Sequence, residues 1–192
     1  NLFVPKGVEV VSMKGKTPEW NNNYTTQSKA LLPNIPLAIL IDNKSASASE
    51  IVAGTLQDLD RALIVGQESF GKGLVQQTKK LAYGSRIKIT VAKYYTASGR
   101  CVQRLHYGDR DDLGDATIQA DSTLQTFYTK NGRPVIEGRG VIPDLEINVE
   151  KLNYVLSGIL DSGVLFDFAV NEMNAGAAQN CIPNCIAFSC CL

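Results

Sequence analysis

One stretch decides the fold: residues 35–66, which read IPLAILIDNKSASASEIVAGTLQDLDRALIVG. Its first part, 35–42, is a continuous apolar run that ends at Asp42, a pattern typical of a strand buried on both faces of a parallel sheet. Small polar residues then precede an apolar stripe at helical spacing, with Glu50 in the first turn, where the helix dipole favours an acid. A second short apolar run, 62–66, follows. The stretch therefore predicts a βαβ unit with a right-handed crossover.

Outside this unit, strand patterns alternate with polar loops. Residues 8–13 predict a strand, and residues 14–29, with Pro18 and three consecutive asparagines, predict a polar loop. Segments 74–81 and 85–96 alternate apolar and polar residues around a turn and predict an antiparallel hairpin. The remaining predictions are a turn at 96–100, a strand at 101–105, an irregular charged surface insertion at 106–122, an extended segment at 138–149 and one or two amphipathic helices at 151–174.

Composition and charge exclude several classes of protein. The 192 residues are 44% hydrophobic and 20% charged, as in an ordinary globular protein. Basic and acidic residues number 19 each, so the net charge is zero and no nucleic-acid partner is expected. No apolar run approaches the length of a membrane span. Because Asn1 is not a start methionine, we expect the sequence to begin inside a longer protein.

Four of the five cysteines lie in the last thirteen residues, NCIPNCIAFSCCL. Their spacing matches no standard zinc site and no histidine is near, so no metal or other cofactor is expected. Disulfides in an oxidising compartment are one interpretation of residues 179–192, and a disordered or non-native tail is the other. Cys101 stands alone in the body of the chain and is expected to be a small buried apolar residue.

Three familiar motifs are nearly present and fail. Residues 66–72 read Gly-x-x-x-x-Gly-Lys, but Gly73 stands where a phosphate loop needs Ser or Thr, and strand formers follow in place of a helix. Ser69-x-x-Lys72 matches the pairing of penicillin-recognising enzymes, whose other motifs are absent. The only histidine, His106, lies in the charged insertion, where a solvated loop residue is expected. A Ser-His-Asp triad is therefore nearly excluded, and any serine hydrolase chemistry needs another base.

Lys72 is the candidate base. A lysine deprotonates a serine only if burial lowers its pKa well below the ordinary value of about 10.4. Apolar residues and glycines surround Lys72, and no carboxylate is closer in sequence than Glu68, so a neutral amine in a dry pocket is one expectation. A loop lysine that reaches solvent is the other. The candidate nucleophiles are Ser45, Ser47 and Ser49, because helix-initial amides stabilise an oxyanion, although such a serine also serves as a simple cap.

Residues 43–77 closely resemble the C-terminal processing peptidases, also called tail-specific proteases. The likeness continues through ITVAKYYTASGRCVQ (89–103) and GRGVIPDLEI (138–147) and covers roughly residues 1–149. It implies an α/β fold with a ClpP/crotonase-like core, a βαβ unit, a mixed sheet and a C-terminal helical appendage. The implied division is the C-terminal part of a catalytic domain at 1–150, a helical appendage at 151–178 and the Cys-rich tail at 179–192.

The resemblance also implies a mechanism and a location. Ser47 corresponds to the nucleophile, Lys72 to the general base, Gln76 to the residue that orients the lysine amine, and the amide of Ala48 to one oxyanion donor. The implied activity is serine endopeptidase cleavage of protein or peptide substrates near their C-termini through an acyl-enzyme, in a bacterial cell envelope or periplasm. The resemblance is compatible with a homo-oligomer and with peripheral membrane attachment through an N-terminal part missing here.

Three departures and two alternatives accompany this interpretation. A PDZ domain and a glycine-rich oxyanion segment are expected upstream of Asn1, so the chain by itself is expected to be an incomplete enzyme. The insertion at 106–122 and the cysteine tail are not part of the family pattern. A non-catalytic binding or scaffold relative of the same fold is the main alternative, and an acyl-CoA-type enzyme of the related superfold is a third. The joint presence of Ser47, Lys72 and Gln76 favours the peptidase.

Overall fold

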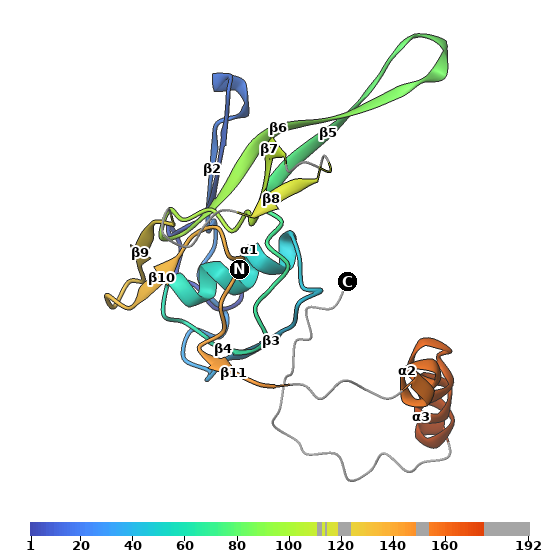
Figure 1. Ribbon diagram of the computed structural model, residues 1–192. Helices are drawn as coiled ribbons and strands as arrows, with labels where there is room; N and C mark the ends of the chain where they lie inside the picture. The colour runs from blue at the N-terminus through green and yellow to red at the C-terminus, as the bar shows by residue number, and fades with distance from the viewer. Residues whose placement is uncertain (111–112, 114, 119–123, 149–153, 175–192) are drawn as a thin grey trace. The chain divides into compact units, whose positions relative to one another are not determined.

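The computed structural model describes residues 1–110, 113, 115–118, 124–148 and 154–174 (Figure 1). The chain divides into two units, a larger one over Asn1–Ile147 and a smaller one that contains two helices, α2 (Tyr154–Asp161) and α3 (Val164–Asn174). No helix within the described ranges is long and apolar enough to cross a bilayer. The Cys-rich tail predicted at 179–192 lies outside the described residues.

The predicted βαβ unit is present. Strands β3 (Ala38–Ile41) and β4 (Leu63–Gly66) pair in parallel, and helix α1 (Ala48–Asp58) connects them. The core forms around this unit from Val4, Ile39, Ile41, Ala53, Leu56, Ala62, Ile64, Val102 and Val141. β11 (Leu145–Glu146) pairs with β4 in parallel and lies within the segment 138–149 that was predicted to be extended. Because the carboxyl ends of parallel strands lie at one edge, the loops that follow β3 and β4 both leave from that edge.

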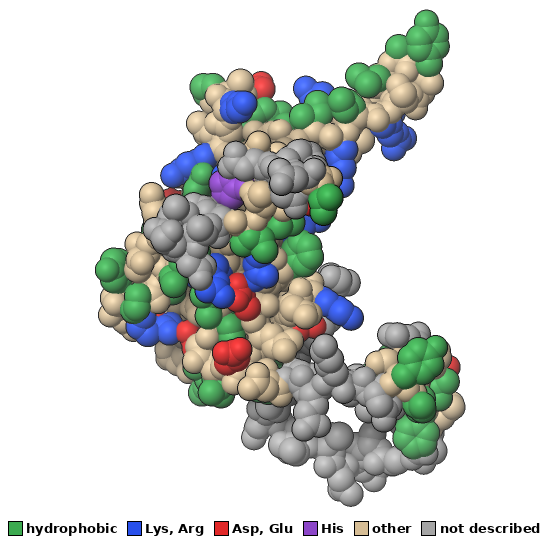
Figure 2. Space-filling model, in the orientation of Figure 1, with side chains coloured by type: hydrophobic (Ala, Val, Ile, Leu, Met, Phe, Trp, Pro, Cys, Tyr) green, Lys and Arg blue, Asp and Glu red, His purple; other side chains and the backbone are tan. Residues whose placement is uncertain are grey.

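A second sheet is antiparallel and has the strand order β2-β1-β6-β5. Its strands are β1 (Glu9–Gly15), β2 (Asn22–Thr25), β5 (Leu74–Lys80) and β6 (Arg86–Thr96). The predicted hairpin is confirmed as β5–β6, with a short 3-10 turn, Ala82–Gly84, at its tip. This hairpin projects away from the rest of the larger unit (Figure 1), and hydrophobic side chains gather at its far end (Figure 2). The fold is therefore α/β, with one parallel sheet, one four-stranded antiparallel sheet and two antiparallel strand pairs among the described residues. The single mixed sheet that the resemblance implies is not found there, because parallel and antiparallel pairings occur in separate sheets.

Three segments differ from the sequence predictions. The loop predicted at 14–29 contains a 3-10 turn, Pro18–Trp20, and strand β2, because the polar run NNYT finds backbone partners on β1. The insertion at 106–122 is not irregular where it is described: β7 (Leu105–Arg110) pairs with β8 (Ala116–Ile118). Residues 101–104 form no strand, because their carbonyls and amides bond instead to the loop segments at Gly71, Gly138 and Gly140. A further pair, β9 (Thr126–Tyr128) and β10 (Pro134–Ile136), lies between β8 and β11.

A buried ion pair fixes the carboxyl end of α1. Arg100 and Asp58 approach to 3.0 Å with side chains 1% and 0% exposed, and Arg100 also donates to Gln57 Oε1 at 2.7 Å. Burial lowers the pKa of the Arg100 guanidinium, and the charge of Asp58 opposes that shift. Breaking such a pair costs about 3–5 kcal/mol, because one charge is left buried without a partner. The helix is thus held firmly at the end opposite to Ser47. Cys101, next in the chain, is buried as expected, and burial raises the pKa of its thiol.

Candidate active site

Ser47 occupies the position that precedes the first turn of α1. Its backbone has φ 58° and ψ −113°, a conformation that residues other than glycine rarely adopt. Such strain persists only where surrounding contacts enforce it, and it concentrates at functional sites. The side chain is half-buried. The amide of Ala48, the first residue of the helix, belongs to the group of helix-initial amides that have no acceptor within the helix.

The three candidate serines have different surroundings. Ser45 is 2% exposed, and its hydroxyl and amide both donate to Asp42 Oδ1 at 2.8 Å. Burial would raise the pKa of the Asp42 carboxyl, but hydrogen bonds from Ser45 and from the amide of Lys44 outweigh it and lower that pKa. Ser49 is the second residue of the helix. Ser45 therefore closes the loop after β3, whereas Ser47 lies directly before the first turn of α1.

The Glu50 carboxylate is the centre of the site. It is 1% exposed and accepts four hydrogen bonds, two on each oxygen. Oε1 accepts from the Ser69 hydroxyl at 2.6 Å and from the amide of Gly71 at 2.7 Å. Oε2 accepts from the amides of Ser47 and Lys72, each at 2.8 Å. The carboxylate thus joins the mouth of α1 to the whole loop that follows β4.

The shared oxygen fixes the separation of the two predicted catalytic residues. The backbone nitrogens of Ser47 and Lys72 can be no further apart than the sum of their two distances to Glu50 Oε2. Two residues that are 25 positions apart in sequence are therefore neighbours in space. Charge-assisted hydrogen bonds of this kind are roughly twice as strong as neutral ones, so the neighbourhood is firmly set.

The side chain of Lys72 is exposed, so the expectation of an amine in a dry pocket is wrong for this structure. The reason is local: the amides of Gly71 and Lys72 turn inward to Glu50, and the amide of Gly73 donates to Gln103 Oε1 at 2.8 Å. The backbone of this loop faces the interior, and the lysine side chain is left at the surface. The other expectation for Lys72, a loop lysine that reaches solvent, describes the observed position.

A regular strand from Lys72 would place Gln76, four positions on, on the same face as the lysine, but Gln76 reaches the cavity of Lys72 by a different route. The strand does not run regularly from Lys72: β5 begins at Leu74, and its register to β6 shifts between Val75 and Gln76. The two side chains nevertheless line one cavity of about 260 Å³, together with Gln103 and Tyr107. The structure therefore brings Lys72 and Gln76 to one hollow through a bulge and not through strand periodicity.

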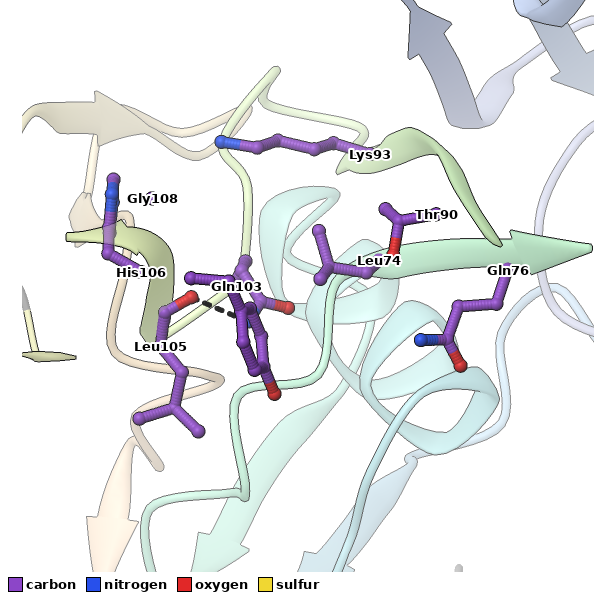
Figure 3. A pocket seen from close by; sticks show the side chains of 9 residues that line it. Leu74, Gln76, Thr90, Lys93, Gln103, Leu105, His106 and Gly108 are labelled. Carbon is purple, nitrogen blue, oxygen red and sulfur yellow. Dashed lines mark hydrogen bonds between the residues drawn. The ribbon is translucent and has the colours of Figure 1, made fainter. Parts of the chain in front are cut away.

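A larger neighbouring cavity, of about 370 Å³, shares Gln76 and Gln103 with the first (Figure 3). The side-chain amide of Gln103 donates through Nε2 to the carbonyl oxygen of Leu105 at 2.9 Å, and this bond holds the start of β7 against the cavity (Figure 3). His106, expected as a solvated loop residue, lies on β7 and lines this cavity. Within the described part of the chain, no three metal-ligating side chains gather.

Sequence reasoning missed Glu50 and Gln103 as parts of the site. Glu50 had been assigned only to the helix dipole, although Ser-x-x-Glu ahead of an apolar run is the capping-box pattern and predicts the bond to the amide of Ser47. The bonds from Ser69, Gly71 and Lys72 carry no local signal, because they join segments about 20 residues apart. No local sequence pattern predicts that Gln103 accepts the amide hydrogen of Gly73.

Gly140 offers a test of how tightly this centre is packed. It has φ +70°, and an added Cβ would lie 2.6 Å from Ser69 Oγ and 2.8 Å from the Ser69 carbonyl oxygen. Gly132 has a similar φ of +83° and nothing within 4 Å of an added Cβ. We expect Gly140→Ala to lower the free energy of unfolding by about 1–3 kcal/mol more than Gly132→Ala, because only the first adds a clash to the backbone strain. Urea denaturation measures both, and equal losses would contradict the packing described.

Comparison with known proteins places this geometry in a family. The model of the family described as Peptidase family S41 matches residues 1–112, more than half of the chain. The chain belongs to peptidase family S41. The matched range contains both Ser47 and Lys72 and the loops that carry them.

Two curated relatives of this S41 chain are named as proteases. It is 49% identical over 104 residues to a carboxyl-terminal-processing protease of Synechocystis sp., covering 54% of this chain and 24% of the relative. It is 38% identical over 147 residues to a probable CtpA-like serine protease of Staphylococcus epidermidis, covering 75% of this chain and 26% of the relative. The chain therefore spans only a quarter of the length of these relatives.

A solved structure supports the fold. The photosystem II D1 C-terminal processing protease superposes on 82% of this S41 chain with a TM-score of 0.54 and 26% identity, and the match covers 32% of that protein. The likeness to this solved structure thus extends over most of the chain.

Proposed function

We propose that this chain carries the catalytic serine and lysine of a serine endopeptidase that cleaves protein substrates near their C-termini. Membership of family S41 and the names of the curated relatives support this proposal. The observation that carries it is the pair of 2.8 Å hydrogen bonds by which Ser47 and Lys72 share one carboxylate oxygen. The proposed core is of the ClpP/crotonase type, with α2 and α3 as a helical appendage after a catalytic part at 1–150.

The proposed mechanism is acyl transfer with lysine as the base. A neutral Lys72 amine accepts the proton of the Ser47 hydroxyl while Oγ attacks the peptide carbonyl carbon. The developing oxyanion accepts a hydrogen bond from the amide of Ala48 at the start of α1. Lys72 then gives the proton to the leaving amine of the substrate. The Lys72 amine, neutral again, deprotonates a water molecule, and that water hydrolyses the acyl-enzyme. Gln76, in the same cavity as Lys72, orients the amine.

The exposed position of Lys72 requires a step that removes water. A substrate peptide laid over the cavity of Lys72 and Gln76 covers the amine and disfavours its charged form, because desolvation penalises an ammonium. In this proposal the bound reactant, whether a substrate peptide or the alkyl chain of a fluorophosphonate, supplies the apolar surroundings that the described residues do not. The proposed location, a bacterial cell envelope or periplasm, and the proposed homo-oligomer rest on family likeness alone.

Labelling by a serine-reactive fluorophosphonate tests the proposal directly. We expect one adduct on the wild-type chain by intact mass, no adduct on Ser47→Ala, and wild-type labelling of Ser49→Ala, a matched removal of a neighbouring hydroxyl. An adduct on folded Ser47→Ala would assign the nucleophile elsewhere. A folded protein that contains this chain together with the expected upstream glycine-rich segment, and that takes no label, would favour the non-catalytic scaffold of the same fold.

A further inference from the structure

The β5–β6 hairpin forms an arm whose side chains are exposed on every side. All residues from 76 to 90 are exposed, over both strands and the turn. The arm projects away from the body of the larger unit (Figure 1). Backbone pairing continues to its end, from Gln76 opposite Thr90 to Lys80 opposite Arg86, so the arm is an ordered ribbon one layer thick. None of the described residues covers either face of this ribbon, and an uncovered apolar surface indicates a binding partner.

Apolar side chains gather on one face and at the tip of this arm. Residues directly opposite in an antiparallel pair share a face, so the pairs Lys79 with Ile87 and Gln77 with Ile89 define one face. Leu81, two positions after Lys79, continues it. Leu81, Ile87 and Ile89 are 53%, 42% and 40% exposed, and Tyr83 at the tip is fully exposed. The far end of the arm accordingly shows a cap of hydrophobic side chains (Figure 2).

The arm is also the most strongly basic part of a chain with zero net charge. No aspartate or glutamate occurs between Glu68 and Asp109. The outer half of the arm carries four cations, Lys79, Lys80, Arg86 and Lys88. These cations lie on both faces of the arm. Because the ribbon is one layer thick, all of them stay within about 10 Å of a surface that contacts the apolar face. That distance is about one Debye length at 0.1 M salt. Their charges therefore act together.

We propose that this arm docks on the surface of an anionic lipid bilayer, with Leu81, Tyr83 and Ile87 in the interface and the four cations beside the headgroups. Charge complementarity selects the anionic surface, since juxtamembrane cations are attracted to anionic lipid. A tyrosine at the tip suits the headgroup region, where aromatic residues with a polar end are enriched.

The docking surface is independent of the proposed peptidase chemistry. The side chains that touch lipid lie beyond Thr78, and the cavity of Lys72 and Gln76 lies at the base of the same strand. A rise of about 3.3 Å per residue puts Gln76 roughly 17 Å from Leu81. Failure of lipid binding would leave the fluorophosphonate result untouched, and the reverse also holds.

Vesicle co-sedimentation of the full chain is the test, with vesicles of phosphatidylcholine alone and of phosphatidylcholine with about one third phosphatidylglycerol. We expect sedimentation with the anionic vesicles only, weakening as salt is raised. Lys79→Glu/Lys80→Glu should lower the partition coefficient by roughly tenfold or more. The matched control Lys29→Glu/Lys130→Glu makes the same charge change at exposed lysines off the arm and should leave partitioning within about twofold of wild type.

A second pair of substitutions separates a bilayer from an acidic macromolecule. Leu81→Ser/Tyr83→Ser keeps every charge and changes only exposed side chains, so circular dichroism should be unchanged while vesicle binding falls severalfold. Soluble polyglutamate serves as the polyanion without an interface. Binding to polyglutamate but not to vesicles, equal binding to both vesicle types, or vesicle binding insensitive to Leu81→Ser/Tyr83→Ser would each overturn the proposal.

Discussion

Lys72→Ala should slow fluorophosphonate labelling of Ser47 by about 10²- to 10⁴-fold, the range that a positioned general base contributes. The physical reason is that the Ser47 hydroxyl is a weak nucleophile until a neighbouring base takes its proton. The backbone amide of Lys72 binds Glu50 Oε2, and alanine keeps that amide. The loop should therefore hold its place while the base is lost, and the drop in labelling rate can be assigned to the amine.

The control for this experiment is Lys44→Ala. Lys44 is an exposed lysine three residues before Ser47, and only its amide bonds to Asp42, so its replacement removes a nearby positive charge without touching the site. Its labelling rate should equal that of the wild type. If both variants labelled equally fast, or if Lys72→Ala matched the wild type, lysine would not be the base. Thermal unfolding of each variant shows whether a loss of rate comes from a loss of fold.

The second large effect is expected at Glu50. Glu50→Ala leaves the amides of Ser47, Gly71 and Lys72 and the Ser69 hydroxyl without the acceptor that they share. The Ser69 hydroxyl and the Gly71 amide are buried, and each buried donor without a partner costs about 1–3 kcal/mol, so a loss of about 2–6 kcal/mol in the free energy of unfolding is expected. Chemical denaturation measures it, as a shift of the midpoint.

Two further variants make the Glu50 result specific. Glu50→Gln keeps one of the two acceptor oxygens and should give an intermediate loss. Glu19→Ala removes an exposed carboxylate from the short 3-10 turn after β1 and should change stability by no more than about 0.5 kcal/mol. If Glu50→Ala unfolded at the wild-type midpoint, the carboxylate would not be the link between the helix mouth and the loop.

The sequence predicted those parts of the fold whose signals are local. Continuous apolar runs at 35–42 and 62–66 indicated buried parallel strands, and β3 and β4 confirm them. Alternation on both sides of Tyr83 indicated the hairpin, and β5 and β6 pair as expected. The start of α1 directly after Ser47 follows from the small polar residues that precede its apolar stripe.

Features that depend on distant partners were not predictable in the same way. The run NNYT has no strand signal of its own and becomes β2 because β1 offers its backbone groups. The exposure of Lys72 follows from where the amides of residues 71–73 find acceptors, and Glu50 and Gln103 supply those from other parts of the chain. The apolar neighbours of Lys72 in sequence therefore gave the wrong expectation of a dry pocket.

The anchoring of Ser47 and Lys72 through their peptide groups has an evolutionary consequence. The framework relies on two amides that any residue except proline possesses, so both hydrogen bonds to Glu50 survive replacement of either side chain. A single codon change at either position would remove the proposed chemistry and leave those two hydrogen bonds in place. In a lineage with this architecture, inert descendants would arise readily and persist, while changes at the buried acid between the two segments would be purged.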